Sequence, residues 1–142
     1  MRIHKYHSCE NIFLILDYKE SIDYSALALK YCNEFSSDGL VVFKNDPMEM
    51  IFYNKDGSEA AMCGNGIRAL THYIHDKFGI YNHLNIKTKS GSYDCEIISK
   101  EPFVCSVSLG IGECFKDFTK KKLIVNDKEF ICTLFELGVK HL

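Results

Sequence analysis

The sequence has no long apolar run, no excess of charge of one sign and no closely spaced pair of cysteines. Its first segment, MRIHKYHSCENIFLILDYKE, contains no apolar stretch long enough for a secretory signal or a membrane span. A formal net charge of -2 and a pI of about 6.3 give no electrostatic reason to expect a nucleic acid or an anionic membrane as a partner. We therefore expect a cytoplasmic protein that binds small molecules or other proteins.

The cysteines are seven in number, and no two of them show the C-x-x-C spacing that structural zinc sites use. Their positions are Cys9, Cys32, Cys63, Cys95, Cys105, Cys114 and Cys132. In a cytoplasmic protein we expect these thiols to be reduced, and we expect most of them to be small, buried apolar side chains. The sequence predicts no metal site.

The first half of the chain predicts strands and one helix. With 142 residues and 46% hydrophobic content, the chain can bury one core, so we expect a single domain over residues 1–142. Short apolar runs predict strands at 12–16, 40–43 and 50–53. Asp23 is placed to cap a helix, whose buried face would carry Tyr24, Leu27, Ala28, Tyr31, Cys32 and Phe35.

A second predicted helix begins near Cys63 and ends at Gly79. Its buried face would carry Ile67, Leu70, Thr71, Ile74 and Phe78, and Ala69 and Tyr73 would be buried on its flank. Farther along, apolar residues alternate at 84, 86 and 88, at 93, 95 and 97, and at 103, 105, 107 and 109, and short strands follow at 123–125 and 130–135. The sequence thus predicts an α+β fold in which a mostly antiparallel sheet curls around a central helix.

Cys63, Gly64, Asn65 and Gly66 stand at the start of the second predicted helix. The first turn of a helix leaves backbone N–H groups unpaired and carries partial positive charge, so a thiolate or a carboxylate is stabilised there. The glycines let the backbone approach a ligand closely. We therefore expect the pKa of Cys63 to lie below the usual value of about 8.5, near enough to neutrality for proton exchange. The alternative is a capping cysteine in a glycine turn, with no chemical role.

A longer string around these residues is more specific. Residues 54–68, NKDGSEAAMCGNGIR, resemble the signature of diaminopimelate epimerases almost residue for residue. The resemblance continues at residues 5–7 and 11–13, at 37–40 and at 107–110, and so covers most of the chain.

The resemblance implies a protein of two similar domains, each a sheet wrapped around a central helix, with the active site in the cleft between them. This chain would correspond to the first domain, and the second would be absent. The implied enzyme is an isomerase of lysine biosynthesis that converts LL- to meso-diaminopimelate without pyridoxal phosphate, metal or other cofactor. One cysteine removes the α-proton as a thiolate, and a second delivers a proton to the opposite face as a thiol.

Residue-by-residue matching identifies Cys63 as the first of these catalytic cysteines. Asn11, Asn54, Gly64 and Asn65 match positions that hold the amino and carboxylate groups of the substrate. Outside this motif, Asn11 and Asn54 would be interpreted as turn asparagines that bond to local backbone groups.

Two departures from the family pattern leave alternatives open. Ser8, Cys9, Glu10 and Ile12 replace glycines and an acidic residue, so the preferred amino acid is not fixed. Residues 136–142 lack the Asn-Pro pair that leads into the second domain, and no second Cys-Gly helix start is present. One hypothesis is a truncated or split epimerase, incomplete alone, that needs a second-domain polypeptide or a homo-oligomer. A second is a non-catalytic remnant that binds an amino acid or a protein, and a third is a proline-racemase-like enzyme, a family that usually has histidine where Asn65 stands.

Overall fold

The computed structural model describes residues 1–79, 82–108, 119–137 and 139–141. The chain divides into two compact units, Met1–Leu109 and Gly110–Leu142. The single-domain prediction for residues 1–142 stays a prediction, because the two units are described separately. Over the described residues, no helix is long and apolar enough to cross a membrane.

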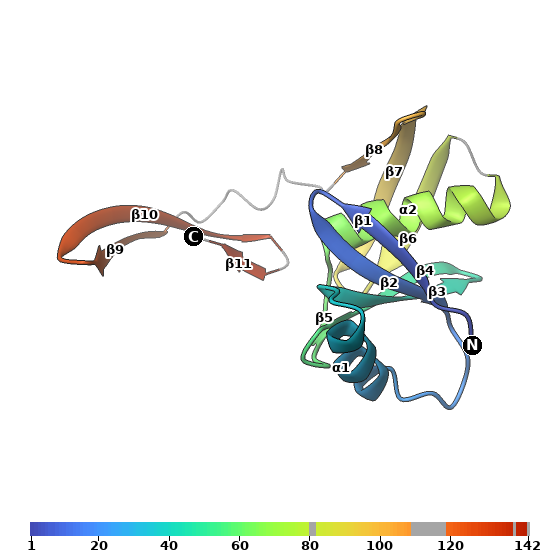
Figure 1. The fold of residues 1–142 in the computed structure, drawn as a ribbon. Coiled ribbons are helices and arrows are strands. Elements are labelled where there is room, and N and C mark those ends of the chain that lie inside the picture. Colours follow the sequence, from blue (N-terminus) through green and yellow to red (C-terminus); the bar gives the residue numbers. More distant parts are fainter. Residues whose placement is uncertain (80–81, 109–118, 138, 142) are drawn as a thin grey trace. The chain divides into compact units, whose positions relative to one another are not determined.

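The first unit contains an eight-stranded sheet and two helices (Figure 1). Its strands are β1 (His4–Ser8), β2 (Asn11–Asp17), β3 (Gly39–Asn45), β4 (Met48–Asn54), β5 (Glu59–Ala60), β6 (His83–Thr88), β7 (Gly91–Lys100) and β8 (Phe103–Ser108). Their order is β1-β2-β3-β4-β6-β7-β8, with β5 paired to β4. Only β2 with β3 and β4 with β6 pair in parallel among these described strands, so the predicted mostly antiparallel α+β fold is confirmed.

Strands β2 and β3 are buried on both faces, which explains their continuous apolar runs FLIL and LVVF. Side chains alternate between the two faces of a strand. Leu14 and Leu16 therefore share one face, where they pack with Tyr24, Ala28 and Cys32 of α1 (Tyr24–Glu34). The other face meets α2 (Gly64–Phe78), as the edge-to-face contact between Phe43 and Tyr73 shows. The two helices thus cover opposite faces of the sheet.

Helix α1 begins where the sequence predicts. Asp23 caps it by accepting a hydrogen bond from the Ala26 N–H at 3.0 Å. Tyr24, Ala28 and Cys32 are buried, but the prediction for Phe35 is wrong, because this residue lies at the C-cap, past the last turn, and is 41% exposed.

Helix α2 is the central helix, and Figure 1 shows it lying along the inside of the curled sheet. It contacts β1, β2, β3, β4, β7 and β8, and it ends at Gly79, which adopts φ 65. Burial of Ala69 and Tyr73 beside the main apolar face confirms that it is enclosed on more than one side. The prediction for Phe78 is wrong, because this residue lies in the final turn and is 43% exposed.

The second unit is a three-stranded antiparallel sheet in the order β11-β10-β9. Its strands are β9 (Thr119–Val125), β10 (Lys128–Leu137) and β11 (Val139–His141). Strands β9 and β10 are joined by Asn126 and Asp127, both at positive φ, as a two-residue hairpin turn requires. The predicted strands at 123–125 and 130–135 are confirmed, with longer boundaries.

The expectation that most cysteines are buried is wrong for the described residues. Cys32 and Cys95 are buried, Cys9 is exposed, and Cys63, Cys105 and Cys132 are partly exposed. Cys9 lies in the tight turn between β1 and β2, and Cys105 lies on the sheet's edge strand β8, where neighbours cover it less. Cys114 and the predicted strand residue Leu109 lie outside the described residues.

Candidate functional site

Three strand ends meet at one edge of the first unit. Because β2 and β3 are parallel, their N-terminal ends lie at the same end of the sheet, and Phe13 pairs with Gly39, the first residue of β3. Strand β4 runs the opposite way, so its last residue, Asn54, pairs with the same glycine. Asn11, the first residue of β2, therefore lies at the edge of the sheet where Asn54 lies, although the two are far apart in sequence.

Helix α2 begins at this same edge. Strand β5 pairs with β4 through Ala60 and Phe52, and Cys63 follows a few residues later as the N-cap of α2. The ring of Phe52 lies 3.7 Å from the position that a Cβ would take on Gly66. Cys63 and the helix start are thus packed against the sheet at the edge that carries Asn11 and Asn54.

Cys63 is held beneath the first turn of α2. Its backbone is extended, with φ -143 and ψ 109, and its Sγ accepts a hydrogen bond from the Gly66 N–H at 3.3 Å. Burial raises the pKa of the Cys63 thiol, the N–H groups of Gly66 and Asn65 lower it, and the Asp38 carboxylate raises it again. The result is a pKa above the ordinary cysteine value. The expectation of a lowered pKa is therefore wrong for this structure, because loss of water around the sulfur outweighs the helix N–H groups.

A chain of side-chain hydrogen bonds runs beside Cys63. Arg68 Nη1 donates to Asn65 Oδ1 at 2.9 Å, and Asn65 Nδ2 donates to Asn11 Oδ1 at 2.8 Å. Asn11 Nδ2 donates to Asp38 Oδ2 at 3.4 Å, and the same oxygen accepts the Ile12 N–H at 2.8 Å. The structure thus brings together Asn11 and Asn65, and it adds Arg68 and Asp38, to which sequence reasoning assigned no role. Both lie within motif segments, 54–68 and 37–40, which was the available signal.

Asn54 is bonded within its own turn. Its Nδ2 donates to Ser58 Oγ at 2.9 Å, and its N–H donates to the Ser58 carbonyl at 2.8 Å. Asp56 accepts from the Ser58 hydroxyl at 2.6 Å and closes the turn. These contacts fit the turn interpretation, and a ligand contact for Asn54 stays a prediction.

Gly64 and Gly66 differ in the space around them. A Cβ on Gly64 would meet no heavy atom within 4 Å, whereas one on Gly66 would lie 3.3 Å from the sulfur of Cys63. Gly64 therefore marks the open side of the helix start and Gly66 the packed side. An open helix N-terminus has unpaired N–H groups that can receive an anion.

A cleft of about 690 Å³ opens beside this site, between β1, α2 and β8. Arg68, Cys9 and Cys105 are among its lining residues. Arg68 Nη1 lies 3.9 Å from the Cys9 sulfur, and the Cys105 thiol lies 3.8 Å from the Arg68 carbonyl oxygen. Burial and the nearby Cys95 raise the pKa of Cys105 to about 11, so Cys105 is a thiol at neutral pH.

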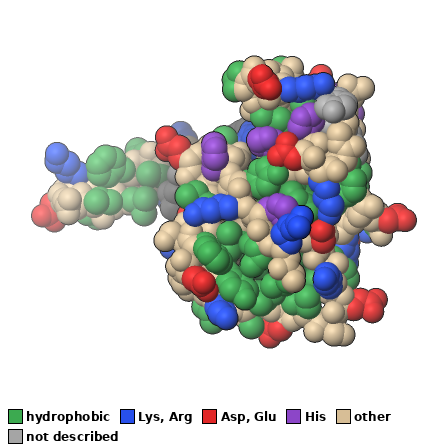
Figure 2. Space-filling view, turned by 45° about the vertical axis from the view of Figure 1, so that its right-hand side comes forward, with side chains coloured by type: hydrophobic (Ala, Val, Ile, Leu, Met, Phe, Trp, Pro, Cys, Tyr) green, Lys and Arg blue, Asp and Glu red, His purple; other side chains and the backbone are tan. Residues whose placement is uncertain are grey.

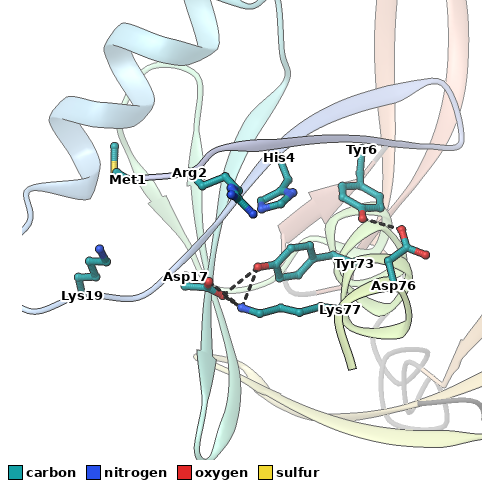
Figure 3. Close-up of a pocket in the computed structure, with 9 residues that line it drawn as sticks. All are labelled: Met1, Arg2, His4, Tyr6, Asp17, Lys19, Tyr73, Asp76 and Lys77. Atoms are coloured by element: carbon teal, nitrogen blue, oxygen red, sulfur yellow. Dashed lines mark hydrogen bonds and ion pairs between the residues drawn. The ribbon is translucent and has the colours of Figure 1, made fainter. Parts of the chain in front are cut away.

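A second cleft, of about 540 Å³, lies at the other end of α2 (Figure 3). There Lys77 Nζ is 2.6 Å from both carboxylate oxygens of Asp17, and the Tyr73 hydroxyl donates to Asp17 at 2.9 Å. The Tyr6 hydroxyl donates to Asp76 at 2.6 Å. The acidic groups of this cleft are thus paired, and they fasten β1 and β2 to the C-terminal turns of α2.

Charges of both signs are scattered among apolar and polar side chains on the face shown in Figure 2. Within the ranges that the structure describes, no group of three or more His, Cys, Asp or Glu side chains is arranged to hold a metal ion.

Comparison with known sequences gives a consistent result. The family model for diaminopimelate epimerase matches residues 3–114. Diaminopimelate epimerases from Caldanaerobacter subterraneus and Campylobacter jejuni are 32% and 33% identical to this chain, covering 92% and 100% of it. One from Helicobacter pylori is 34% identical and covers 100% of it. The chain spans 50% of the first of these relatives and 56% of each of the other two, about half of their length.

Solved structures support the fold. A phenazine biosynthesis protein of the PhzF family from Bacillus anthracis superposes with a TM-score of 0.56 at 17% identity, covering 75% of this chain and 40% of that one. A PhzC/PhzF protein from Clostridium difficile gives a TM-score of 0.51 at 16% identity, covering 67% and 40%. At these identities the likeness concerns the curled sheet around its helix and says nothing of function.

Proposed function

Because this chain belongs to the diaminopimelate epimerase family, a family of isomerases, we propose that it carries one half of a cofactor-independent site that inverts the α-carbon of diaminopimelate. Cys63 is the acid/base group of this half. The observation that carries the proposal is the position of its sulfur, under the first turn of α2 and beside the linked amides of Asn65 and Asn11.

The protonation state of Cys63 supports the role of acid. With a pKa above the ordinary cysteine value, Cys63 is a thiol at neutral pH. In inversion, a base on one face takes the α-proton, and the C–H electron pair stays on the α-carbon. The Cys63 S–H then delivers its proton to the other face and is left as a thiolate. In the reverse direction this thiolate is the base.

The helix start supplies the complementary electrostatics. An α-proton of an amino acid is weakly acidic, so the developing negative charge must be stabilised by dipoles that are already in place. The open helix start at Gly64, with the side-chain amides of Asn65 and Asn11, is suited to hold the substrate carboxylate where that charge accumulates. Asn54 holds the amino group in this proposal, with its Oδ1 accepting from the ligand while its Nδ2 keeps the hydrogen bond to Ser58.

The second half of the site comes from elsewhere in this proposal. The relatives are about twice as long as the matched region, and the base that opposes Cys63 has no assigned residue here. We propose that a second-domain polypeptide, or another copy of the chain, supplies it, and that this chain alone does not complete the inversion used in lysine biosynthesis.

A non-catalytic role in binding an amino acid or a partner protein is the second candidate. The local bonding of Asn54 favours it, because the contacts of this residue in the structure are those of a turn asparagine.

Proton NMR of LL- and meso-diaminopimelate in D₂O separates the two candidates. Because Cys63 lies on one face of the substrate, we expect exchange only at α-carbons of one configuration. Exchange at L centres removes the whole α-proton signal of LL-diaminopimelate and half of that of meso-diaminopimelate, and exchange at D centres removes only half of the meso signal. The rate should rise from about pH 7 to about pH 10, as the Cys63 thiolate forms. A two-sided site would remove the whole α-proton signal of both isomers.

Cys63→Ala should abolish the exchange, and Cys132→Ala, which removes a thiol in the second unit, should leave it unchanged. If neither isomer exchanges above the Cys63→Ala background at any pH in this range, the catalytic proposal is wrong and the binding role replaces it.

A further inference from the structure

The hydrogen-bond chain beside Cys63 has two ends of opposite chemistry. A guanidinium can only donate hydrogen bonds and a carboxylate can only accept them, whereas an amide does both. Arg68 takes the oxygen of Asn65, so the Asn65 nitrogen faces away and donates to the oxygen of Asn11. The Asn11 nitrogen then donates to Asp38. The charged ends therefore define the orientation of both amides.

Each amide keeps one spare N–H group. An amide nitrogen carries two hydrogens, of which Asn65 uses one on Asn11, and Asn11 uses one on Asp38. Both amide oxygens are already engaged as acceptors. What the pair can offer a ligand is thus mainly donors, next to the open helix start at Gly64. Clustered N–H donors favour a carboxylate.

We propose that Arg68 and Asp38 are positioning residues, which hold the amides of Asn65 and Asn11 with their spare N–H groups toward a ligand carboxylate. The idea rests on the proposed function, since a substrate carboxylate is the ligand. Without Arg68, the Asn65 amide is free to turn by half a rotation, and its oxygen would then face the carboxylate and repel it. Arg68 thus fixes the orientation of the Asn11 amide through Asn65, without contacting Asn11.

Side-chain amide NMR tests this transmission. In a ¹⁵N-labelled chain, the N–H₂ signals of Asn65 and Asn11 are followed in Arg68→Met, Arg68→Lys and Asp38→Asn. We expect Arg68→Met to shift the signals of both amides, and Arg68→Lys, which keeps a charged donor, to restore part of the shift. Asp38→Asn should move Asn11 and, through it, Asn65. Lys89→Met, which removes an exposed ion pair with Glu59, is the matched control and should move neither amide.

A purely structural role for Arg68 predicts that only its direct partner, Asn65, responds, and that result would overturn the proposal. If Arg68→Met does not fold, Asp38→Asn carries the same test from the other end, where an unchanged Asn65 signal would overturn it.

Titration of the same samples with meso-diaminopimelate tests the ligand. A saturable shift of both amides, weakened at least about tenfold in Arg68→Met, supports the carboxylate assignment, and no saturable shift overturns it. If Arg68→Met shifts both amide signals but the ligand shifts neither, Arg68 positions the amides and the proposed function is wrong. If the ligand shifts both signals but Arg68→Met shifts only Asn65, the proposed function stands and the positioning role of Arg68 is wrong.

Discussion

Gly64 and Gly66 offer a matched pair of substitutions in the first turn of α2. Alanine at either position removes the same backbone freedom and gains up to about 1 kcal/mol of helix propensity. The surroundings differ. An added Cβ at Gly66 would lie 3.2 Å from the Cys63 Cβ and 3.3 Å from its sulfur, whereas at Gly64 it would meet nothing within 4 Å. The difference between the two variants therefore isolates the contact with Cys63.

Forcing an extra carbon into a packed site costs about 1–3 kcal/mol. We expect Gly64→Ala to match the wild type or exceed its free energy of unfolding by up to about 1 kcal/mol. Gly66→Ala should be about 1–3 kcal/mol less stable than Gly64→Ala. Urea unfolding followed by far-ultraviolet circular dichroism, which reports on α1 and α2, measures both values.

Equal stability of the two alanine variants would refute this reasoning. It would mean that the Cys63 side chain does not pack beneath the helix start, and the burial that raises the pKa of Cys63 would then lose its structural basis.

Three further predictions concern charge and backbone strain. Burial raises the pKa of Asp17, but hydrogen bonds from Lys77 and Tyr73 and the Lys77 charge leave it below its ordinary value. The ion pair of Asp17 with Lys77 therefore stabilises the fold at pH values above the unfolded-state pKa of Asp17, and this stabilisation is lost as the pH falls through the folded-state pKa. Asp17→Asn should therefore lower the free energy of unfolding by about 1 kcal/mol at neutral pH, since the pair is partly exposed, and urea titrations should show this loss shrinking below about pH 4. Asp38→Asn removes a carboxylate that raises the pKa of Cys63, so Cys63 should react faster with iodoacetamide at mildly alkaline pH, and an unchanged rate would argue against the electrostatic contact. Glu10 has φ 66, a strained value for a residue with a side chain, so Glu10→Gly should raise the free energy of unfolding by roughly 1 kcal/mol, and a loss of stability would contradict the turn geometry.

Features that depend on neighbours in sequence were predicted well. Helix α1 follows from Asp23 and the apolar spacing after it, and α2 follows from the glycine-rich start and Gly79. The bond between Asn65 and Arg68 was not predicted, although residues three apart lie on one face of a helix and this spacing was the available signal.

Features that depend on distant segments were missed. Strand β1 is polar, with the sequence HKYHS, and only its pairing with β2 makes it a strand. The link from Asn65 to Asn11 crosses 54 positions of sequence. The direction of the Cys63 pKa shift was missed for the same reason. The position at a helix start, which the sequence shows, lowers the pKa, but burial by tertiary packing raises it by more. Phe35 and Phe78 are exposed although they fit the apolar pattern, because the pattern does not show where the end of a helix extends past the hydrophobic core.

A titration of Cys63 shows whether this residue is a protonated acid held under a helix start. The rate of iodoacetamide labelling of Cys63, resolved from the other thiols by peptide mass spectrometry, is measured against pH in the native chain and in concentrated urea. The midpoint of the profile reports the pKa whatever the absolute rate. We predict a native midpoint above the unfolded one. A native midpoint at or below the unfolded value would contradict this prediction, because the pKa of Cys63 would then not be raised by folding.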